Sequence, residues 1–339
     1  MIHLVPFTAD WIEATRAFNN RVAATGFDFP LEPAESSYLA VDGDAVRGAY
    51  MLRRQAVYFH GDEAEAAHFR LPLSEGTADR AYLSVGVQLL RHAMRQQPLL
   101  YALGMGGMAN PLPRLLATAG WRLAEVPFFF KVVRPFRLLR GIKYLRHSRP
   151  RRLAMDLAAF SGAGWACLRL IQPAVRSALA VECVDQFGAW ADDLWWSCRG
   201  AYACIAQRDS GTLNERYGGT KYLRLKVSNL GWAVALDTQM RGDANFGYLR
   251  VATIADTLSV PGAADDVILA TTAFLERRGV DLIISNQMHV AWREALRAAR
   301  FRAGPSNFVF AVSKPLAARF EDNGQAHINR GDGDGPIHL

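Results

Sequence analysis

The sequence of 339 residues lacks the signatures of several large protein classes. It contains no run of eighteen uncharged apolar residues, which argues against a transmembrane helix. Its first residues show no basic stretch followed by an apolar core, so we expect no secretory signal and a cytoplasmic protein. There are four cysteines, without C-x-x-C spacing or histidines that would complete a zinc set. We therefore expect free thiols and no bound metal.

Negative charge is missing from one stretch of the chain. Residues 131–152 contain nine lysines and arginines and no acidic residue, whereas the whole chain has a net charge of +7. A local basic segment attracts anionic lipids and phosphates. We therefore expect peripheral contact with an anionic membrane, at its inner face, through residues 131–152. We do not expect nucleic acid as a partner, because no helix-turn-helix signature occurs.

The chain contains an internal repeat. Residues 110–135 align with residues 290–315 without a gap, at an offset of 180. Each copy begins as an amphipathic helix and ends as an apolar strand, and the identities fall on positions spaced for a helix face and then for a strand. A period this long is typical of two homologous domains rather than of a solenoid. The identical pairs include Leu116 and Leu296, Phe128 and Phe308, Phe130 and Phe310, and Pro135 and Pro315.

Hydrophobic patterning predicts the same order of elements in both halves: strand, helix, antiparallel strands, helix, strand, helix, strand. We expect domains at residues 1–135 and 181–330, separated by a basic, amphipathic connector at residues 136–180. The glycine-rich residues 331–339 predict a loosely ordered tail. Predicted strands are residues 2–7, 38–41, 46–58, 67–73, 99–103, 126–133, 223–227, 232–238, 248–254 and 281–285, and predicted helices include residues 78–95, 110–120, 190–203, 210–217 and 264–278.

This order of elements, together with the repeat, resembles the GNAT superfamily of acyltransferases, present as a tandem pair. The implied fold class is α/β, with an α+β mixed sheet in each of two tandem GNAT-like domains joined by a basic helical connector. In such a domain two central parallel strands splay apart. The resemblance implies that acyl-CoA or acetyl-CoA lies in that split as co-substrate. Its pyrophosphate would sit on backbone N–H groups where the fourth strand turns into the next helix.

The resemblance implies a donor site in the first domain. The family's phosphate loop needs small residues at a helix start, because backbone N–H groups must approach phosphate oxygens and the helix dipole favours negative charge. Ser84, Val85 and Gly86 hold the corresponding positions, and we add Asn110 at the start of the later helix. In the second domain Asp266 stands 180 residues after Gly86. Its carboxylate would repel a phosphate at about 4 Å by roughly 4 kcal/mol, so we expect that domain to bind coenzyme A poorly.

Proton transfer must differ from the family pattern. Family members often carry a tyrosine on the later helix that protonates the leaving thiolate, but Leu116 and Leu296 occupy that place here. The strand ends of the second domain offer bases instead. His289 is the best candidate by its ordinary pKa, and the Asp256 carboxylate is the alternative. The structural alternative is that His289 caps a helix and has no catalytic role.

One short segment carries a further resemblance. Residues 212–217, Thr-Leu-Asn-Glu-Arg-Tyr, are similar to a Leu-Asn-x-Arg-Tyr motif of GNAT-like proteins linked to bacterial surface polysaccharides and of FemAB-like aminoacyl transferases. The resemblance implies that Asn214, Arg216 and Tyr217, with Asn286 after a parallel strand, bind a small-molecule or glycan acceptor. The structural alternative is a buried arginine paired with a carboxylate.

These expectations combine into a function. We expect an acyltransferase that moves an acyl group from an acyl-CoA-type thioester to an amine or hydroxyl acceptor, such as an amino-sugar or a surface-polysaccharide precursor. Two alternatives stay open: a FemAB-like transferase that uses aminoacyl-tRNA, and a non-catalytic module that binds a sugar or a partner. Co-purifying tRNA, with binding that weakens steeply in salt, would favour the first alternative. The absence of any thermal response to thioesters would favour the second.

Overall fold

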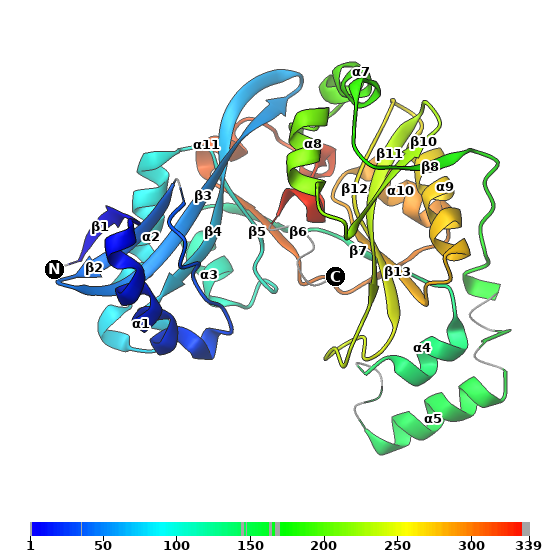
Figure 1. Cartoon of the computed structure of the whole chain (residues 1–339), viewed down its shortest axis with the longest axis horizontal. Coiled ribbons are helices and arrows are strands. Elements are labelled where there is room, and N and C mark those ends of the chain that lie inside the picture. Colours follow the sequence, from blue (N-terminus) through cyan, green and yellow to red (C-terminus); the bar gives the residue numbers. More distant parts are fainter. Residues whose placement is uncertain are drawn as a thin grey trace. The chain divides into compact units, whose positions relative to one another are not determined.

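The computed structural model describes residues 2–34, 36–143, 146, 148–162, 165–166 and 170–333. The chain forms two compact units, and Figure 1 shows that each combines helices with a mixed sheet. The predicted fold class is therefore confirmed. The bounds of the units differ from the predicted domains at 1–135 and 181–330. The first unit comprises the residues up to 57, 63–125 and 307–321, and the second comprises 58–62, 126–306 and the residues from 322 onward.

In the first unit the strand order is β1-β2-β3-β4-β5-β15-β6, with β4 and β5 parallel. Helix α2 buries Val85, Leu89 and Ala93, at the spacing of one helix face, in a cluster with strand side chains. Helix α1 buries Phe18 and Val22 in a second cluster. The elements are β1 (His3–Pro6), α1 (Ile12–Val22), β2 (Ser37–Asp42), β3 (Ala45–Phe59), β4 (Asp62–Ser74), α2 (Ser84–Gln96), β5 (Leu100–Gly104), α3 (Pro111–Thr118), β6 (Arg122–Glu125), β15 (Val309–Val312) and α11 (Lys314–Ala317).

In the second unit the strand order is β14-β7-β13-β12-β11-β10-β8, with β12 and β13 parallel. The short strand β9 pairs in parallel with β16 and also pairs with β3. Helices α9 and α10 bury Val267, Leu275, Trp292 and Leu296 in one core cluster. The elements are β7 (Phe128–Val132), α4 (Pro135–Gly141), α5 (Arg149–Phe160), β8 (Val181–Val184), α7 (Ala189–Cys198), β9 (Cys204–Ala206), α8 (Ser210–Tyr217), β10 (Tyr222–Val227), β11 (Gly231–Gln239), β12 (Arg250–Ser259), α9 (Ala264–Arg277), β13 (Leu282–Asn286), α10 (Val290–Ala298), β14 (Arg302–Gly304) and β16 (Ala326–His327).

The last strand of each repeat is exchanged between the units. β7 lies between β13 and β14 of the second unit, and β15 lies between β5 and β6 of the first. Val126 and Pro127 link β6 to β7. A tight hairpin turn requires positive φ angles, whereas proline fixes φ at about −65°, so this link disfavours a return of β7 beside β6. Residues 128–132 and 309–312, which belong to the two copies of the repeat, fill equivalent positions in the two sheets.

The predicted connector belongs to the second unit and contains α4 and α5. No helix among the described residues is long and apolar enough to cross a membrane. Lys131, at the start of the predicted basic segment, is fully buried in β7, which corrects its assignment to a basic surface. Its ammonium donates hydrogen bonds to the carbonyls of Pro173 at 2.8 Å and Ala299 at 3.0 Å, and lies 3.6 Å from the carboxylate of Glu276.

The glycine-rich end of the chain is folded as far as it is described. Gly331 and Asp332 are buried in a short 3-10 helix, Arg330–Asp332, which the Asn329 side chain caps. The prediction of a loosely ordered tail at residues 331–339 is therefore wrong for residues 331–333. Residues 334–339 lie outside the described residues.

Candidate active site

The parallel strands of the first unit diverge. β4 and β5 pair at two positions, Ala67 with Leu100 and His68 with Tyr101. Beyond His68, β4 continues to its end with no further pairing to β5 among the described residues. Leu71 in this stretch has a φ of +43°, a left-handed conformation that is strained for leucine and bends the strand. Among the described residues, β4 and β5 therefore form no ladder beyond this pair.

Two helices begin where the diverging strands end. α2 follows β4 through two 3-10 turns, Glu75–Thr77 and Arg80–Tyr82. α3 follows β5 through residues 104–107, which all have positive φ. Since the carboxyl ends of parallel strands meet at one edge of a sheet, the starts of α2 and α3 lie at the same edge. A Cβ added at Gly86 would lie 3.7 Å from the Leu115 side chain, so the two helices touch there.

The residues predicted to bind the donor lie at these helix starts. Ser84 is exposed, and its hydroxyl accepts a hydrogen bond at 3.2 Å from a side chain one turn along α2. The Val85 side chain is buried in the core, so it can offer a ligand only its backbone. Gly86 is half-buried. Asn110 is exposed, and its amide donates to the Met105 carbonyl at 2.8 Å.

The loop before α2 carries charges of both signs. Glu75 is buried and accepts hydrogen bonds from Arg21 at 2.9 Å and from Arg47 at 3.1 Å. Asp79 caps the second 3-10 turn by accepting the N–H two residues along at 2.9 Å. Arg80 is exposed beside this cap. A phosphate at this helix start would have to compete with the Asp79 carboxylate for N–H groups, while Arg80 would offset its charge.

Sequence reasoning missed two rings at the point where the strands part. His68 and Tyr101 stack with centroids 4.8 Å apart and ring planes 5° from parallel, and both are buried. Gln55 donates to the Tyr101 hydroxyl at 2.7 Å. No motif marks these residues, because each is a single polar ring in an otherwise apolar strand.

The equivalent strands of the second unit also diverge. β12 and β13 pair at four positions, from Val251 with Leu282 to Ile254 with Ser285. A bulge at Ala255 then interrupts the pairing of β12 with β11, and β12 continues without β13 among the described residues. The two units therefore share the diverging parallel pair that the predicted fold requires.

The space beside β12 is occupied by the chain's own residues 326–333, here called the C-terminal segment. The Met288 N–H donates to the Ile328 carbonyl at 2.9 Å. The His327 ring nitrogen Nε2 donates to the Thr257 carbonyl of β12 at 2.7 Å. Most of the segment is buried, including His327.

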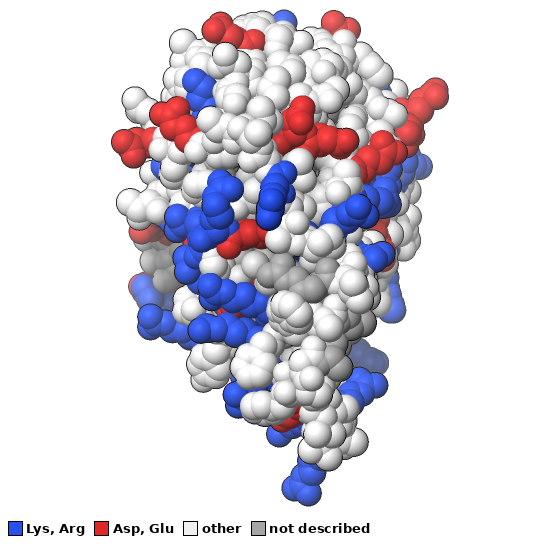
Figure 2. Space-filling view, turned by 90° about the vertical axis from the view of Figure 1, so that its right-hand side faces the viewer, with Lys and Arg blue, Asp and Glu red and all other residues white. Residues whose placement is uncertain are grey.

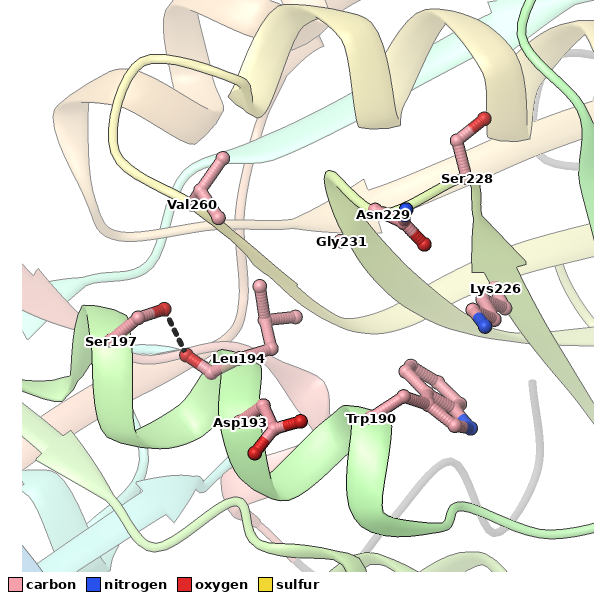
Figure 3. A pocket seen from close by; sticks show the side chains of 9 residues that line it. All are labelled: Trp190, Asp193, Leu194, Ser197, Lys226, Ser228, Asn229, Gly231 and Val260. Carbon is pink, nitrogen blue, oxygen red and sulfur yellow. Dashed lines mark hydrogen bonds between the residues drawn. The ribbon is translucent and has the colours of Figure 1, made fainter.

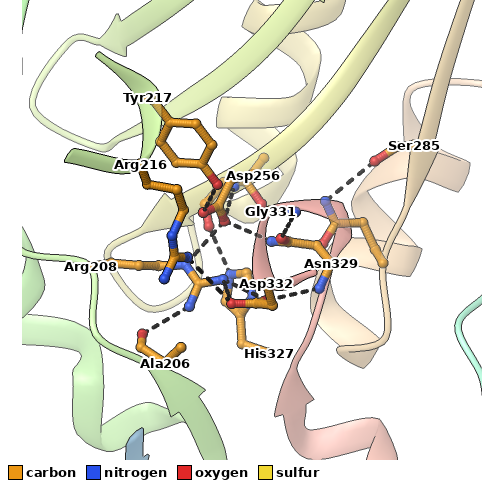
Figure 4. A network of polar contacts seen from close by, with 12 residues as sticks. Ala206, Arg208, Arg216, Tyr217, Asp256, Ser285, His327, Asn329, Gly331 and Asp332 are labelled. Carbon is orange, nitrogen blue, oxygen red and sulfur yellow. Dashed lines mark hydrogen bonds and ion pairs between the residues drawn. The ribbon is translucent and has the colours of Figure 1, made fainter. Parts of the chain in front are cut away.

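Figure 4 shows a buried polar network around Arg208 that fastens this segment. The guanidinium donates to Asp256 at 3.0 Å and to the two carboxylate oxygens of Asp332 at 2.9 and 2.8 Å. Asp256 also accepts hydrogen bonds from the Tyr217 hydroxyl at 2.8 Å and from the Asn329 amide at 2.7 Å. Arg208 and Asp256 are fully buried. Because Asp332 and Asn329 belong to the C-terminal segment, the network ties the segment to β12.

The electrostatics of this network suit a structural role. Burial by itself raises the pKa of Asp256, but the charges of Arg208 and Arg216 outweigh it and hold the pKa below its usual 3.8. Burial raises the pKa of Tyr217, which stays a neutral donor. A Cβ added at Gly331 would collide with the Tyr217 hydroxyl, so the packing is tight. An ionised, enclosed and fully bonded carboxylate cannot take a proton from an acceptor, which argues against the predicted role of Asp256 as a base.

His289 and Asn286 also hold backbone and side chains in place. The Nδ1 atom of His289 caps α10 by accepting the Ala291 N–H at 3.3 Å, which assigns the ring proton to Nε2. Burial, followed by the charge of Arg293, lowers the pKa of His289 to about 4. The ring therefore stays neutral at pH 7 with its acceptor nitrogen engaged, which argues against a general base. The Asn286 side-chain oxygen accepts from Arg330 at 2.8 Å.

The Leu-Asn-x-Arg-Tyr segment is built into the same region. Asn214 exchanges two hydrogen bonds with the backbone of Phe187, at 2.8 and 2.9 Å. Arg216 lies 3.6 Å from Asp332 and is nearly buried, which matches the structural alternative of a buried arginine beside a carboxylate. With Tyr217 bonded to Asp256, the structure brings Arg216 and Tyr217 together as parts of the network around Arg208.

A separate pocket of about 280 Å³ lies between α7 and the turn that joins β10 to β11 (Figure 3). Trp190 forms one wall, and the Lys226 ammonium lies 5.0 Å from the centroid of its ring. Asp193, Ser197 and Asn229 add a carboxylate, a hydroxyl and an amide. An apolar ring beside several hydrogen-bonding groups can contact both the apolar and the polar parts of a small ligand.

No protein-family model matches the sequence, and no curated protein matches it. Solved structures do match. A GCN5-related N-acetyltransferase from Anabaena variabilis aligns with a TM-score of 0.54 and 10% identity, over 91% of this chain and 72% of that chain. A GCN5-related N-acetyltransferase from Kribbella flavida aligns with a TM-score of 0.54 and 12% identity, over 94% of this chain and 73% of that chain. N-myristoyltransferase from Saccharomyces cerevisiae with bound myristoyl-CoA aligns with a TM-score of 0.53 and 9% identity, over 96% of this chain and 84% of that chain. At such identities the likeness shows the fold: the chain has the fold of GNAT-type acyltransferases.

Acid is expected to destabilise the region around the C-terminal segment. Burial lowers the pKa of His327 well below 6.5, as it lowers that of His289 to about 4. As the pH falls, the unfolded chain therefore protonates these rings before the folded chain does. The stability that the neutral rings provide is complete above pH 6.5 and is lost as the pH falls toward 4. For His289 the shift corresponds to about 3 kcal/mol. Urea unfolding followed from about pH 7 downward measures this loss.

The matched variant for this prediction is His289→Gln, which retains a polar side chain at the cap and does not titrate. Its free energy of unfolding should fall less steeply between pH 6.5 and 4 than that of the parent protein. Equal slopes for the two proteins would contradict the assignment of His289 as a buried neutral ring.

Proposed function

We propose that the protein is an acyltransferase that moves an acyl group from an acyl-CoA-type thioester, such as acetyl-CoA, to an amine or hydroxyl acceptor. The observation that carries this proposal is the divergence of β4 and β5 after two residue pairs. Where the pairing of the two strands ends, an extended thioester arm can run along β4 and pair its amides with the strand backbone. The fold shared with acyltransferases, one of them holding myristoyl-CoA, supports the same conclusion.

We place the donor in the first unit. Its phosphates would lie near Ser84, Gly86 and Asn110, where the helix starts supply N–H groups and positive dipole ends. The second unit is less suitable, because the C-terminal segment occupies the side of β12 and because α9 begins with Asp265 and Asp266. Negative side chains at a helix start take the place that a pyrophosphate would need.

Catalysis in this proposal depends on positioning. Holding donor and acceptor together removes most of the entropic cost of their encounter, and a backbone N–H of β4 stabilises the negative charge that develops on the thioester oxygen. Because His289 and Asp256 are engaged elsewhere, solvent takes the proton of the acceptor. An amine loses its proton readily after attack, so this arrangement favours an amine over a hydroxyl acceptor.

The leaving thiolate needs a proton donor in place of the tyrosine that Leu116 replaces. We propose Tyr101, since it forms the last residue pair before β4 and β5 part and its ring stacks on His68. Tyr101→Phe is expected to lower kcat at least tenfold with little change in the KM for the donor. Tyr50→Phe is the matched control, because it removes a buried hydroxyl that bonds to His92 on the neighbouring helix. Equal loss in both variants would exclude a specific role for Tyr101.

Donor binding in the first unit can be tested by adding charge. Gly86→Glu is expected to abolish the thermal stabilisation of the protein by acyl-CoA, because a carboxylate would stand beside the pyrophosphate. Gly200→Glu is the matched control, since no atom lies within 4 Å of a Cβ added there. If the Gly86→Glu variant still binds acyl-CoA normally, the donor does not lie in the first unit. If no thioester stabilises even the parent protein, the transferase proposal fails.

We further propose a glycan-type acceptor, such as an amino-sugar or a surface-polysaccharide precursor, and a separate sugar-binding site in the Trp190 pocket of the second unit. Saturation-transfer NMR with glucosamine is expected to show contacts that Trp190→Ala removes. Trp196→Ala removes a more exposed ring from the same helix that does not line the pocket, and should keep the contacts. Loss of signal in both variants, or in neither, would contradict this assignment. A position at the inner face of an anionic membrane, where such precursors are available, completes the proposal.

A further inference from the structure

Helix α5 exposes a row of large apolar side chains. Leu153, Leu157 and Phe160 are 63%, 62% and 68% exposed, and their spacing of four and three residues puts them on one face of the helix. The buried residue of α5, Ala159, lies on another face, and α5 packs against α4. Exposed apolar side chains gathered in one place are uncommon on a monomer and mark surfaces that bind something.

The row extends onto α4. Phe136 is 42% exposed, and its ring meets that of Phe160 with the centroids 5.8 Å apart. The Arg140 guanidinium lies 5.2 Å from the Phe160 ring and 5.8 Å from the Phe136 ring. We call Phe136, Leu153, Leu157 and Phe160 the α5 face. It is a continuous apolar surface with a cation at its edge.

Positive charge surrounds the α5 face. Between residues 131 and 162 there is one acidic side chain, Asp156, and Arg146 pairs with both of its oxygens at 2.8 and 2.9 Å. That pairing offsets the negative charge of Asp156. The lower half of Figure 2, where α4 and α5 lie, is correspondingly rich in blue. Arg134 and Arg137 lie within 4.0 Å of the Asp281 carboxylate. The other exposed cations of this stretch are Arg140, Lys143, Arg149, Arg151 and Arg152.

We infer that the α5 face inserts into the headgroup region of an anionic bilayer. A bilayer of this kind offers negative charge at its surface and hydrocarbon just below it, in the order that the arginines and the apolar row require. The 12 residues of α5 are too few to span a bilayer, so the helix lies along the surface. This inference goes beyond acyl transfer, and it moves the predicted membrane contact from the charges of residues 131–152 to a specific apolar face.

Charge complementarity favours lipid over a second copy of this chain. In a symmetric dimer through the α5 face, Arg140 and the exposed arginines of α5 would approach their own copies, which costs free energy. An anionic surface instead attracts each of them. Each arginine near such a surface contributes about a fivefold gain in binding, and salt screens that contribution.

The experiment is flotation of the full chain with vesicles of phosphatidylcholine containing about one-third phosphatidylserine, with no donor or acceptor present. The parent protein is expected to float with these vesicles and to remain at the bottom with pure phosphatidylcholine. The double variant Leu153→Ser, Leu157→Ser should bind at least about tenfold more weakly. Leu83→Ser is the matched control, because Leu83 is 64% exposed in the first unit. It should float like the parent.

Charge and folding are tested separately. Arg149→Gln, Arg152→Gln should weaken binding by about 25-fold, and added salt should weaken the parent similarly. Circular dichroism and sedimentation check the folding of every variant. Because all the substituted side chains are exposed, we expect native spectra. The inference is overturned if the parent ignores anionic vesicles or if the Leu153 and Leu157 variant floats normally. It is also overturned if the parent sediments as a dimer that this variant dissolves, since the α5 face would then be a self-interface. None of these outcomes bears on acyl transfer, which is measured without vesicles.

Discussion

The second unit depends on one buried cation. Arg208 has no access to water, and an isolated charge in such a place is prohibitively unfavourable unless carboxylates and hydrogen bonds compensate it. Asp256 comes from β12 and Asp332 from the C-terminal segment, so compensating Arg208 joins two distant parts of the chain. The same contacts fill the side of β12 that a donor would need. The diverging strands of the first unit are therefore the better candidate for chemistry.

The exchange of β7 and β15 is a second constraint on both units. Each sheet holds an apolar antiparallel strand next to one edge strand, between β5 and β6 in the first unit and between β13 and β14 in the second. Each repeat supplies this strand to the other unit. Lys131 shows how thoroughly β7 has become part of the second unit, since its ammonium is buried and bonded to backbone carbonyls there. Removing either strand would leave an unpaired edge in the middle of a sheet. The stabilities of the two units are therefore coupled through the chain.

Residues of the candidate sites were predictable to different degrees. Arg216 and Tyr217 were found because they belong to a recognisable segment, and they do lie beside Asp256, but in a structural network. Arg208 and Asn329 carry no local signal, and Asp332 lies in a glycine-rich stretch that is typical of loose ends. Their importance comes from partners more than forty residues away. Likewise, the stacked rings of His68 and Tyr101 become neighbours only when β4 pairs with β5.

The sequence by itself determined the longer strands, most of the helices, the mixed fold class and the repeat, because periodicity and turn residues act over a few positions. The short strands β6, β8, β9, β14 and β16 were not predicted. The predicted helix at 264–278 is α9, whereas the one predicted at 78–95 begins at Ser84 because 3-10 turns precede it. Tertiary structure alone decided which unit receives β7 and β15, that Asp256 and Lys131 are buried, and that Leu153 and Leu157 are exposed. A local pattern records which side chains are apolar or charged. Whether each is covered, paired or left on the surface depends on segments far away in the chain.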